Sequence, residues 1–297
     1  MIRAQQNIIA TIAYRDIFDY PLTRAEIHLW GVGGGVPRIF TLPRGLIQRD
    51  GYVVFVGREC IVGHREQKHA SGRTKWETAR KAGRMLSRIP TVMCIGVTGG
   101  LAMDNAADSD DIDLFFICRR GTLWITRMLV TIVSECMRIR RRPHDHRVSD
   151  KVCLNMFMAE DNLEVPHAEQ DLFSAHEVLQ MKPLWDRGSI HRRFLDANSW
   201  VAYFLPNAWM NVRTNALTVS HANNMILYKA IYVLARCIEP IAKWAQLAYM
   251  KNKRTNEVIR SGMIRFHPHD ARVWIREKYQ KRLKRWDIPI DKFFYHR

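Results

Sequence analysis

The sequence has no two cysteines at the close spacing of a zinc site. Its six cysteines stand singly, mostly within apolar runs, as small core residues of a reduced cytoplasmic protein do. A long uninterrupted apolar run is also missing, because four charged residues and a proline interrupt the most apolar stretch, 226–250, so no membrane span is expected. Residues 1–13 lack the apolar region of a secretion signal. We therefore expect a globular, cytoplasmic protein.

Acidic residues are scarce at both ends of the chain. Residues 1–90 contain 15 Lys and Arg but only 7 Asp and Glu, and residues 251–297 contain 14 but only 5. The remainder is neutral, so the net charge of +17 arises from the two ends. A basic excess of this size suggests a polyanionic partner, either nucleic acid or an anionic membrane surface. The alternative is a basic surface without a specific partner.

The stretch 91–117 begins with a turn suited to binding a ligand. Residues 91–97 form a short apolar run, which is typical of a buried strand. The run ends near Gly99 and Gly100, where the absence of side chains lets the backbone turn sharply and approach a ligand closely. One or two helical turns after this point would direct amide groups back into the turn, a suitable arrangement for phosphate.

Two aspartates follow at the head of a second apolar run, 111–117. Side chains at positions i and i+2 of a strand share a face, so Asp111 and Asp113 are predicted to point the same way. Carboxylates this close repel one another unless a cation lies between them, and Mg²⁺ prefers such oxygen ligands. Alternatively, these residues and the neighbouring Asp108 and Asp110 form only a solvated acidic loop after an ordinary glycine turn.

The complete pattern is strand, Gly-Gly, ten residues, then Asp-hydrophobic-Asp-hydrophobic opening another strand. It resembles the signature of the nucleotidyltransferase superfamily whose fold is shared with DNA polymerase β. The resemblance covers residues 91 to about 160; the rest is only loosely similar to bacterial proteins that carry such a domain after a winged helix. It implies an α+β fold with a mixed sheet and flanking helices. It also implies that Gly99 and Gly100 bind the triphosphate of an NTP such as ATP, and that Asp111 and Asp113 are catalytic and bind one or two Mg²⁺ ions.

Enzymes of this superfamily usually have a third carboxylate on a later strand, which helps to hold a metal and to deprotonate the acceptor. The run 152–158 corresponds to that strand, and the catalytic position at its centre is occupied by Asn155. An amide can bind a metal through its oxygen but is a poor general base. Asp150, at the edge of the strand, is one alternative third carboxylate, and Asp145, further from the strand, is another.

Residues 1–70 are predicted to form a winged-helix domain. A first helix is expected over 4–17, a second after a capping box formed by Thr23 and Glu26, and a third over 39–49. A hairpin of two strands, at 52–56 and 60–62, would follow them. Many winged helices bind DNA through the third helix and the wing, and others only bind proteins. Both alternatives stay open for this domain.

Residues 71–165 are expected to form the nucleotidyltransferase core, entered by an amphipathic helix over 74–89. Residues 166–297 are expected to form a helical C-terminal domain that closes over the pocket. Its first helix would begin at Asp171 and carry His176 and Glu177, which could face the nucleotide or could be core or surface residues.

The resemblance implies transfer of a nucleoside monophosphate from an NTP to an unidentified acceptor, which could be a protein, RNA or a small molecule. Pyrophosphate would be the leaving group. With Asn155 in place of a carboxylate, we expect a slow or specialised enzyme. The rival hypothesis is a non-catalytic regulator: a winged-helix protein that binds nucleic acid or protein and whose transferase core has lost its chemistry.

Overall fold

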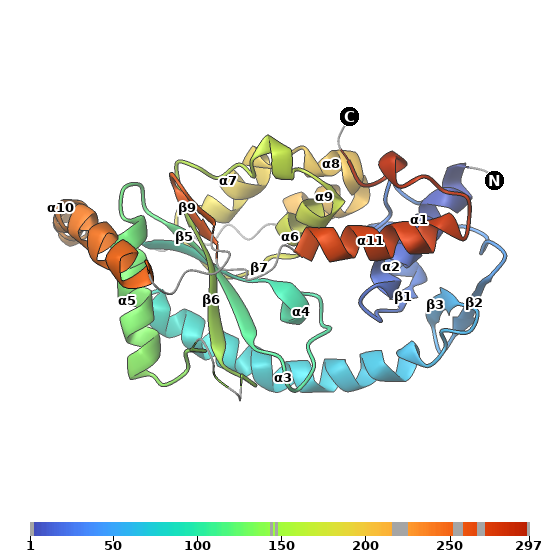
Figure 1. The fold of residues 1–297 in the computed structure, drawn as a ribbon, viewed down its shortest axis with the longest axis horizontal. Helices are drawn as coiled ribbons and strands as arrows, with labels where there is room; N and C mark the ends of the chain where they lie inside the picture. The colour runs from blue at the N-terminus through green and yellow to red at the C-terminus, as the bar shows by residue number, and fades with distance from the viewer. Residues whose placement is uncertain are drawn as a thin grey trace.

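The structure is a computed structural model that describes residues 3–142, 145, 148–215, 225–251, 258–265 and 271–295. Helices surround a six-stranded mixed sheet, so the expected mixture of helix and sheet is confirmed (Figure 1). Within these ranges, no helix has both the length and the apolar character needed to cross a membrane.

The central sheet has the strand order β7-β4-β5-β6-β9-β8. Strands β5 and β6 are parallel, and all other neighbours are antiparallel. The three apolar runs predicted as strands form its middle. The strands are β4 (Val92–Val97), β5 (Ile112–Cys118), β6 (Val152–Ala159), β7 (Lys182–Asp186), β8 (Val258–Arg260) and β9 (Met263–Arg265).

Helices cover both faces of this sheet, and others pack on these helices or in the N-terminal segment. The helices are α1 (Arg3–Asp16), α2 (Arg24–Leu29), α3 (Ile61–Leu86), α4 (Gly99–Ala102), α5 (Leu123–Cys136), α6 (Leu172–Gln180), α7 (Ile190–Ala197), α8 (Val201–Phe204), α9 (Pro206–Asn215), α10 (Met225–Met250) and α11 (Ala271–Lys284), with short 3₁₀ helices η1 (His167–Glu169) and η2 (Ile290–Lys292). The predicted helix over 74–89 is the second half of α3, a single helix of 26 residues that crosses the predicted boundary at residue 70.

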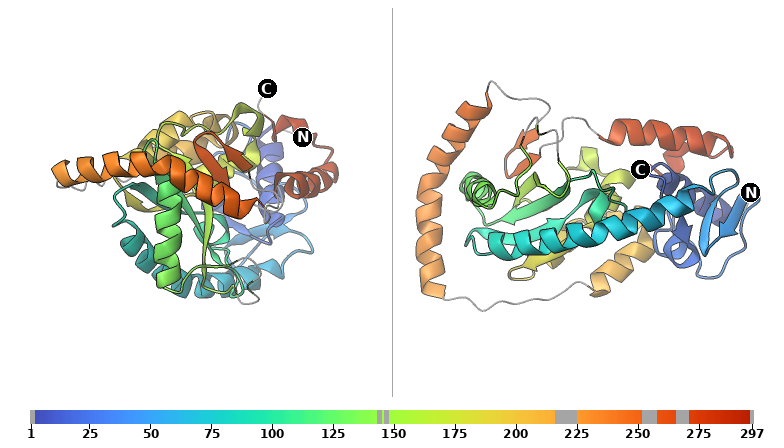
Figure 2. Two further views of the ribbon diagram at one scale, coloured as in Figure 1. Left: turned by 60° about the vertical axis from the view of Figure 1, so that its left-hand side comes forward. Right: turned by 90° about the horizontal axis from the view of Figure 1, so that it is seen from below.

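Side chains of β5 alternate between two apolar cores. Ile112, Leu114 and Phe116 belong to the core that α3, α5 and α10 cover. Phe115 and Ile117 belong to the other core, to which α6, α7 and α11 contribute. Figure 2 shows α10 crossing α5 at one end of the molecule. Because β5 is buried on both faces, its N-terminal end is held firmly where Asp111 and Asp113 lie.

The N-terminal segment contains a small sheet with the order β1-β3-β2, formed by β1 (Leu22–Thr23), β3 (Tyr52–Phe55) and β2 (Leu46–Arg49). The first predicted helix is confirmed as α1. The predicted capping box is also confirmed, since the Glu26 amide donates to Thr23 Oγ1 and the Thr23 amide donates to Glu26 Oε2.

Two predictions for this segment are wrong. The expected third helix over 39–49 is absent, because residues 46–49 form β2 and the residues before them have no helical structure. Three glycines at 33–35 have positive φ, and a proline follows at 43, both of which disfavour a helix. The expected strand over 60–62 instead begins α3, so the hairpin is β2-β3, turning at Asp50 and Gly51. Both turn residues have positive φ, as a two-residue hairpin turn requires.

The expectation that the chain is helical from Asp171 onward is also wrong. Strand β7 pairs with β4 at one side of the sheet, and β9 pairs with β6 at the other. The C-terminal helix α11 packs on α1, with the Tyr279 hydroxyl donating to the Ala10 carbonyl at 3.2 Å (Figure 1). One apolar core therefore contains residues from all three predicted domains, and the division at residues 70 and 165 stays a prediction.

Candidate functional site

The glycine turn lies directly against the carboxylate of Asp113. Gly99 has a φ of +65°, and a Cβ built there would stand 2.4 Å from Asp113 Oδ2. The Thr98 amide, one residue earlier, donates to the Asp113 carbonyl at 3.0 Å. Both the backbone conformation and the lack of space therefore require glycine at position 99. Gly100 is different, since a Cβ there would meet only ordinary contacts, the nearest at 3.5 Å from the Asn105 carbonyl oxygen.

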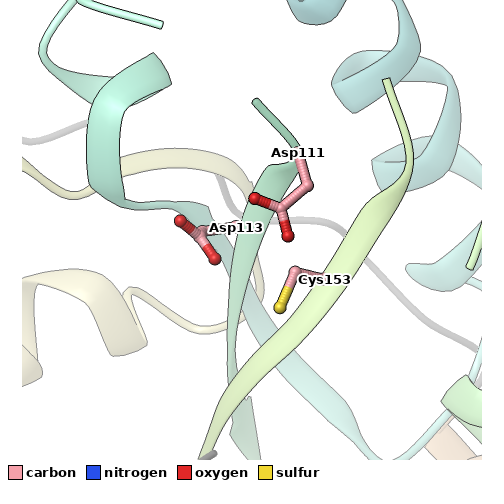
Figure 3. A group of neighbouring side chains, drawn as sticks. All are labelled: Asp111, Asp113 and Cys153. Atoms are coloured by element: carbon pink, nitrogen blue, oxygen red, sulfur yellow. The ribbon is translucent and has the colours of Figure 1, made fainter. Parts of the chain in front are cut away.

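Asp111 and Asp113 lie on the same face at the head of β5, as the alternation of a strand predicts (Figure 3). Cys153 joins them from the adjacent strand β6. One possible metal ligand atom from each of the three side chains lies within 4.8 Å of the others. The Arg141 guanidinium bonds the outer carboxylate, with Nη1 2.6 Å from Asp111 Oδ2.

Electrostatics separate the two aspartates. Burial, together with the nearby carboxylates of Asp111 and Glu177, raises the pKa of Asp113 to about 7. Burial also raises the pKa of the Cys153 thiol, with both aspartates adding to the effect. The thiol is therefore protonated at neutral pH and donates a hydrogen bond to Asp113. A cation bound between these carboxylates would relieve their repulsion.

The register of β5 and β6 brings a further side chain to the aspartates. Asp113 pairs with Cys153, whereas the sequence predicts Asn155 for the third position. Asn155 lies two residues further along β6, at a bulge between Leu154 and Met156. The sequence alone does not set the register between two strands about 40 residues apart. The only feature of the sequence that pointed to Cys153 was its position in the apolar run 152–158.

One alternative third carboxylate, Asp150, has another partner. Its Oδ1 lies 3.0 Å from Nζ of Lys75, a side chain of α3 that is almost completely buried. The same ammonium group donates to the backbone carbonyls of Asp108 and Asp110 at 3.0 and 2.6 Å. Asp150 and Lys75 thus fix the loop that leads to Asp111, and Asp150 is a structural residue in this state.

A cavity of about 520 Å³ opens beside the aspartates. Gly99, Asp113 and Asn155 form part of its wall, and Glu177 of α6 adds a further polar group. The Glu169 carboxylate also lines the cavity and pairs with Arg260 and Arg265 at 2.9 and 2.8 Å. Most of the remaining lining is apolar or aromatic: Phe18, Phe115, Met156, Met158, Val165, Phe173, Val178, Met181, Phe194, Met263, Trp274 and Ile275. Such a cavity has the size and character of a small-molecule site.

The two residues of α6 considered at the sequence level have different roles. Glu177 lines the cavity, and burial raises its pKa to about 7. His176 is buried in the core, stacked on Tyr14 with 4.3 Å between ring centroids. Glu177 therefore presents a carboxyl group that gains or loses a proton near neutral pH.

The donor set fits one hard divalent ion. Asp111 and Asp113 offer carboxylate oxygens, and Mg²⁺ commonly completes its shell with phosphate oxygens and waters. The Cys153 thiol does not suit Mg²⁺, because sulfur is a soft ligand. A second ion would lack a third carboxylate within the cluster that the described residues form.

Comparisons of this chain with protein-family models, with curated proteins and with solved structures give no match. The geometry of the turn, the aspartates and the adjoining cavity is therefore the basis for assigning a function.

Proposed function

We propose that this chain is a Mg²⁺-dependent nucleotidyltransferase with a polymerase β-like core, which transfers a nucleoside monophosphate from an NTP to an acceptor. The observation that carries the proposal is Gly99, in a left-handed conformation, packed against the carboxylate of Asp113, with Asp111 on the same face. The chain order of β4, glycine turn, β5, α5 and β6 supports the same core.

Each residue of the site has a role in this reaction. The bare backbone at Gly99 would let the triphosphate approach the aspartates, and Asp111 and Asp113 would hold Mg²⁺. When bound, the ion supplies charge neutralisation for the phosphates and the leaving pyrophosphate. Arg141, which pairs with Asp111, adds a cation at the outer side of the site. The cavity holds the acceptor.

Glu177 is the best candidate for the base that deprotonates the acceptor. It is a carboxyl group in the cavity wall whose pKa, raised to about 7 by burial, matches the requirement for a base at neutral pH. The protonated thiol of Cys153 cannot accept a proton. A reaction without the usual third carboxylate is expected to be slow.

Thermal unfolding with nucleotides tests the proposal. ATP, GTP, CTP or UTP should raise the Tm only when Mg²⁺ is present, by the equivalent of about 2.7 kcal/mol at a hundredfold excess over Kd. Asp111→Asn combined with Asp113→Asn should abolish the shift. Asp108→Asn removes a charge from the exposed part of the same loop and should retain it. An unchanged Mg²⁺-dependent shift in the double variant would place the nucleotide elsewhere.

One observation favours a second candidate, a nucleotide-binding regulator without catalysis: the residue of β6 that pairs with Asp113 is Cys153, which is not a carboxylate. The absence of the third N-terminal helix removes the usual DNA-reading element, so protein is the better partner for such a regulator. Nucleotide binding without turnover, in the wild type and in Cys153→Asp, would support the regulator.

A further inference from the structure

A second cavity, of about 390 Å³, lies outside the candidate site. Residues of α1, α2, α4, β7 and α9 line it. Met181 lines both cavities and so lies between them. None of Asp111, Asp113 and Glu177 lines it. Much of its wall is apolar: Leu29, Trp30, Ala102, Met103, Leu179, Met181, Pro183, Ala208 and Val212.

The wall of this cavity contains a buried cation, Arg15, that forms no close ion pair with a carboxylate of the described chain. Arg15 is 2% exposed. The two acidic groups of the same wall are already paired. Glu26 lies 2.5 Å from Arg65 Nη2, and Asp104 lies 3.1 Å from Lys182 Nζ. Arg15 therefore has no paired carboxylate at the cavity, and Glu26 and Glu177 act on it only at longer range.

The contacts that Arg15 does make are with neutral groups. When the Gln180 amide turns its oxygen toward Arg15, both terminal nitrogens donate to it at 2.7 Å, and His176 Nδ1 lies at 3.4 Å. The guanidinium also lies over the rings of Trp30 and Tyr20, at 4.8 and 5.9 Å from their centroids. A buried ion without an opposite charge costs several kcal/mol of stability. A bound anion would remove this cost.

A second polar side chain of the wall also lacks partners. His191 is 2% exposed, and neither of its ring nitrogens has a hydrogen-bond partner in the part of the chain that the structure describes. Burial lowers its pKa to about 4, so the ring is neutral and offers one N–H donor and one acceptor. Arg15 Nε is unpartnered in the same way. Unpaired buried donors of this kind are rare in native proteins.

We propose that this cavity binds a small monocarboxylate with an apolar body, whose carboxylate pairs with Arg15 and whose body packs against the apolar wall. A single unpaired cation matches a monoanion better than a doubly charged phosphate ester. The guanidinium also has the planar geometry for a carboxylate. The inference does not depend on the proposed transferase function.

Two monocarboxylates and their neutral amides test the proposal: octanoate with octanamide, and indole-3-acetate with indole-3-acetamide. In thermal unfolding and calorimetry, at least one carboxylate should bind with a Kd below about 1 mM, and its amide should bind at least about tenfold more weakly, because a hydrogen bond to a charged group contributes roughly 1.5–3 kcal/mol. The variant with Asp111→Asn and Asp113→Asn should respond like the wild type, which separates this cavity from the nucleotide site.

Variants locate the response. Arg15→Met should abolish carboxylate binding without lowering the Tm, because it removes an unpaired charge and leaves Gln180 and His176, 3.2 Å apart, to bond each other. Lys182→Met removes a paired cation from the same wall and should retain binding. Val212→Trp should fill the cavity and block it; this variant decides the matter if Arg15→Met does not fold. The proposal is overturned if neither carboxylate binds, if the amides bind equally well, or if Val212→Trp binds like the wild type.

Discussion

At the residue scale, the site is centred on Asp113, a half-buried carboxyl group without a cation of its own. Arg141 bonds Asp111, and the closest partners of Asp113 are the Cys153 thiol and the bare backbone of Gly99. This arrangement is unfavourable for an empty site, because desolvation and the neighbouring Asp111 both oppose ionisation. A residue kept in such surroundings is a candidate for function.

The raised pKa of Asp113 predicts a pH dependence of stability. The folded protein binds a proton at this carboxyl below about pH 7, whereas the unfolded chain keeps it ionised down to about pH 4. The wild type should therefore lose stability relative to Asp113→Asn as the pH rises from 5 to 8, at no more than about 1.4 kcal/mol per pH unit.

Urea unfolding in EDTA, at several pH values, measures this difference. The buried histidines 176 and 191, whose pKa values are lowered, give the opposite slope below about pH 6.5, but they do so in both proteins and cancel in the comparison. Glu177→Gln should change the slope in the same direction as Asp113→Asn. Parallel stability curves for the wild type and Asp113→Asn would contradict the shifted pKa.

A change at Cys153 tests the register of the site. Cys153→Asp supplies a third carboxylate beside Asp113 and should strengthen Mg²⁺ binding, while it destabilises the metal-free protein by adding a third buried negative charge. Any transfer or NTP hydrolysis rate should rise, within the roughly 10²- to 10⁴-fold range of a positioned proton acceptor. Asn155→Asp, two residues further along β6, should leave Mg²⁺ affinity unchanged. The reverse pattern would mean that position 155 is the third-carboxylate position.

At the element scale, the site is made by the connection between β4 and β5. This connection includes the short helix α4 and brings the glycine turn against Asp113. The loop before β5 is held from the other side by α3, through the buried ammonium of Lys75. The glycine turn and the loop before β5, which position the side chains of the site, are therefore both held in place by backbone contacts.

The glycine turn gives a prediction with a matched control. Gly99→Ala and Gly57→Ala both place an L-residue at positive φ, at +65° and +83°, which should cost about 1–2 kcal/mol of unfolding free energy in each. Only the Cβ at position 99 meets a neighbour, Asp113 Oδ2, since nothing lies within 4 Å at position 57. Gly99→Ala should therefore also abolish Mg²⁺-dependent nucleotide stabilisation, measured by thermal unfolding, and Gly57→Ala should preserve it. Equal nucleotide responses would show that the turn has no part in the site.

At the scale of the whole molecule, the two basic ends of the chain lie together. Helices α1 and α11 pack side by side, and Asp16 of the first receives Arg282 at 2.6 Å and Arg58 at 2.8 Å (Figure 1). Some arginines of the two basic ends thus have internal partners. Lys281 and Lys284 of α11, and Arg285 directly after it, are exposed.

The net charge of +17 predicts weak, salt-sensitive binding to polyanions. Affinity for a duplex oligonucleotide, measured by fluorescence anisotropy, should fall about tenfold between roughly 50 and 200 mM salt for every two phosphate contacts. Little sequence preference is expected, because the third N-terminal helix is absent. Lys281→Ala with Lys284→Ala and Arg285→Ala should reduce the salt dependence. Binding that ignores salt, or no binding at low salt, would remove nucleic acid from the candidate partners.

The sequence by itself determined the local features of the site. The turn at Gly99 and the shared face of Asp111 and Asp113 follow from backbone conformation and strand alternation, which involve only neighbouring residues. The capping box at Thr23 and Glu26 is local for the same reason.

Only the tertiary structure decided which distant residues join them. The register of β5 and β6 pairs Cys153 with Asp113, while Asn155 lines the cavity that Asp113 also lines. Long-range pairing also draws β7, β8 and β9 into the sheet from a segment predicted as helical, and packing leaves Arg15 of α1 at a cavity that β7 and α9 help to enclose. These outcomes depend on strand pairing and packing between segments far apart in the chain, where the pattern of apolar residues permits several registers and partners.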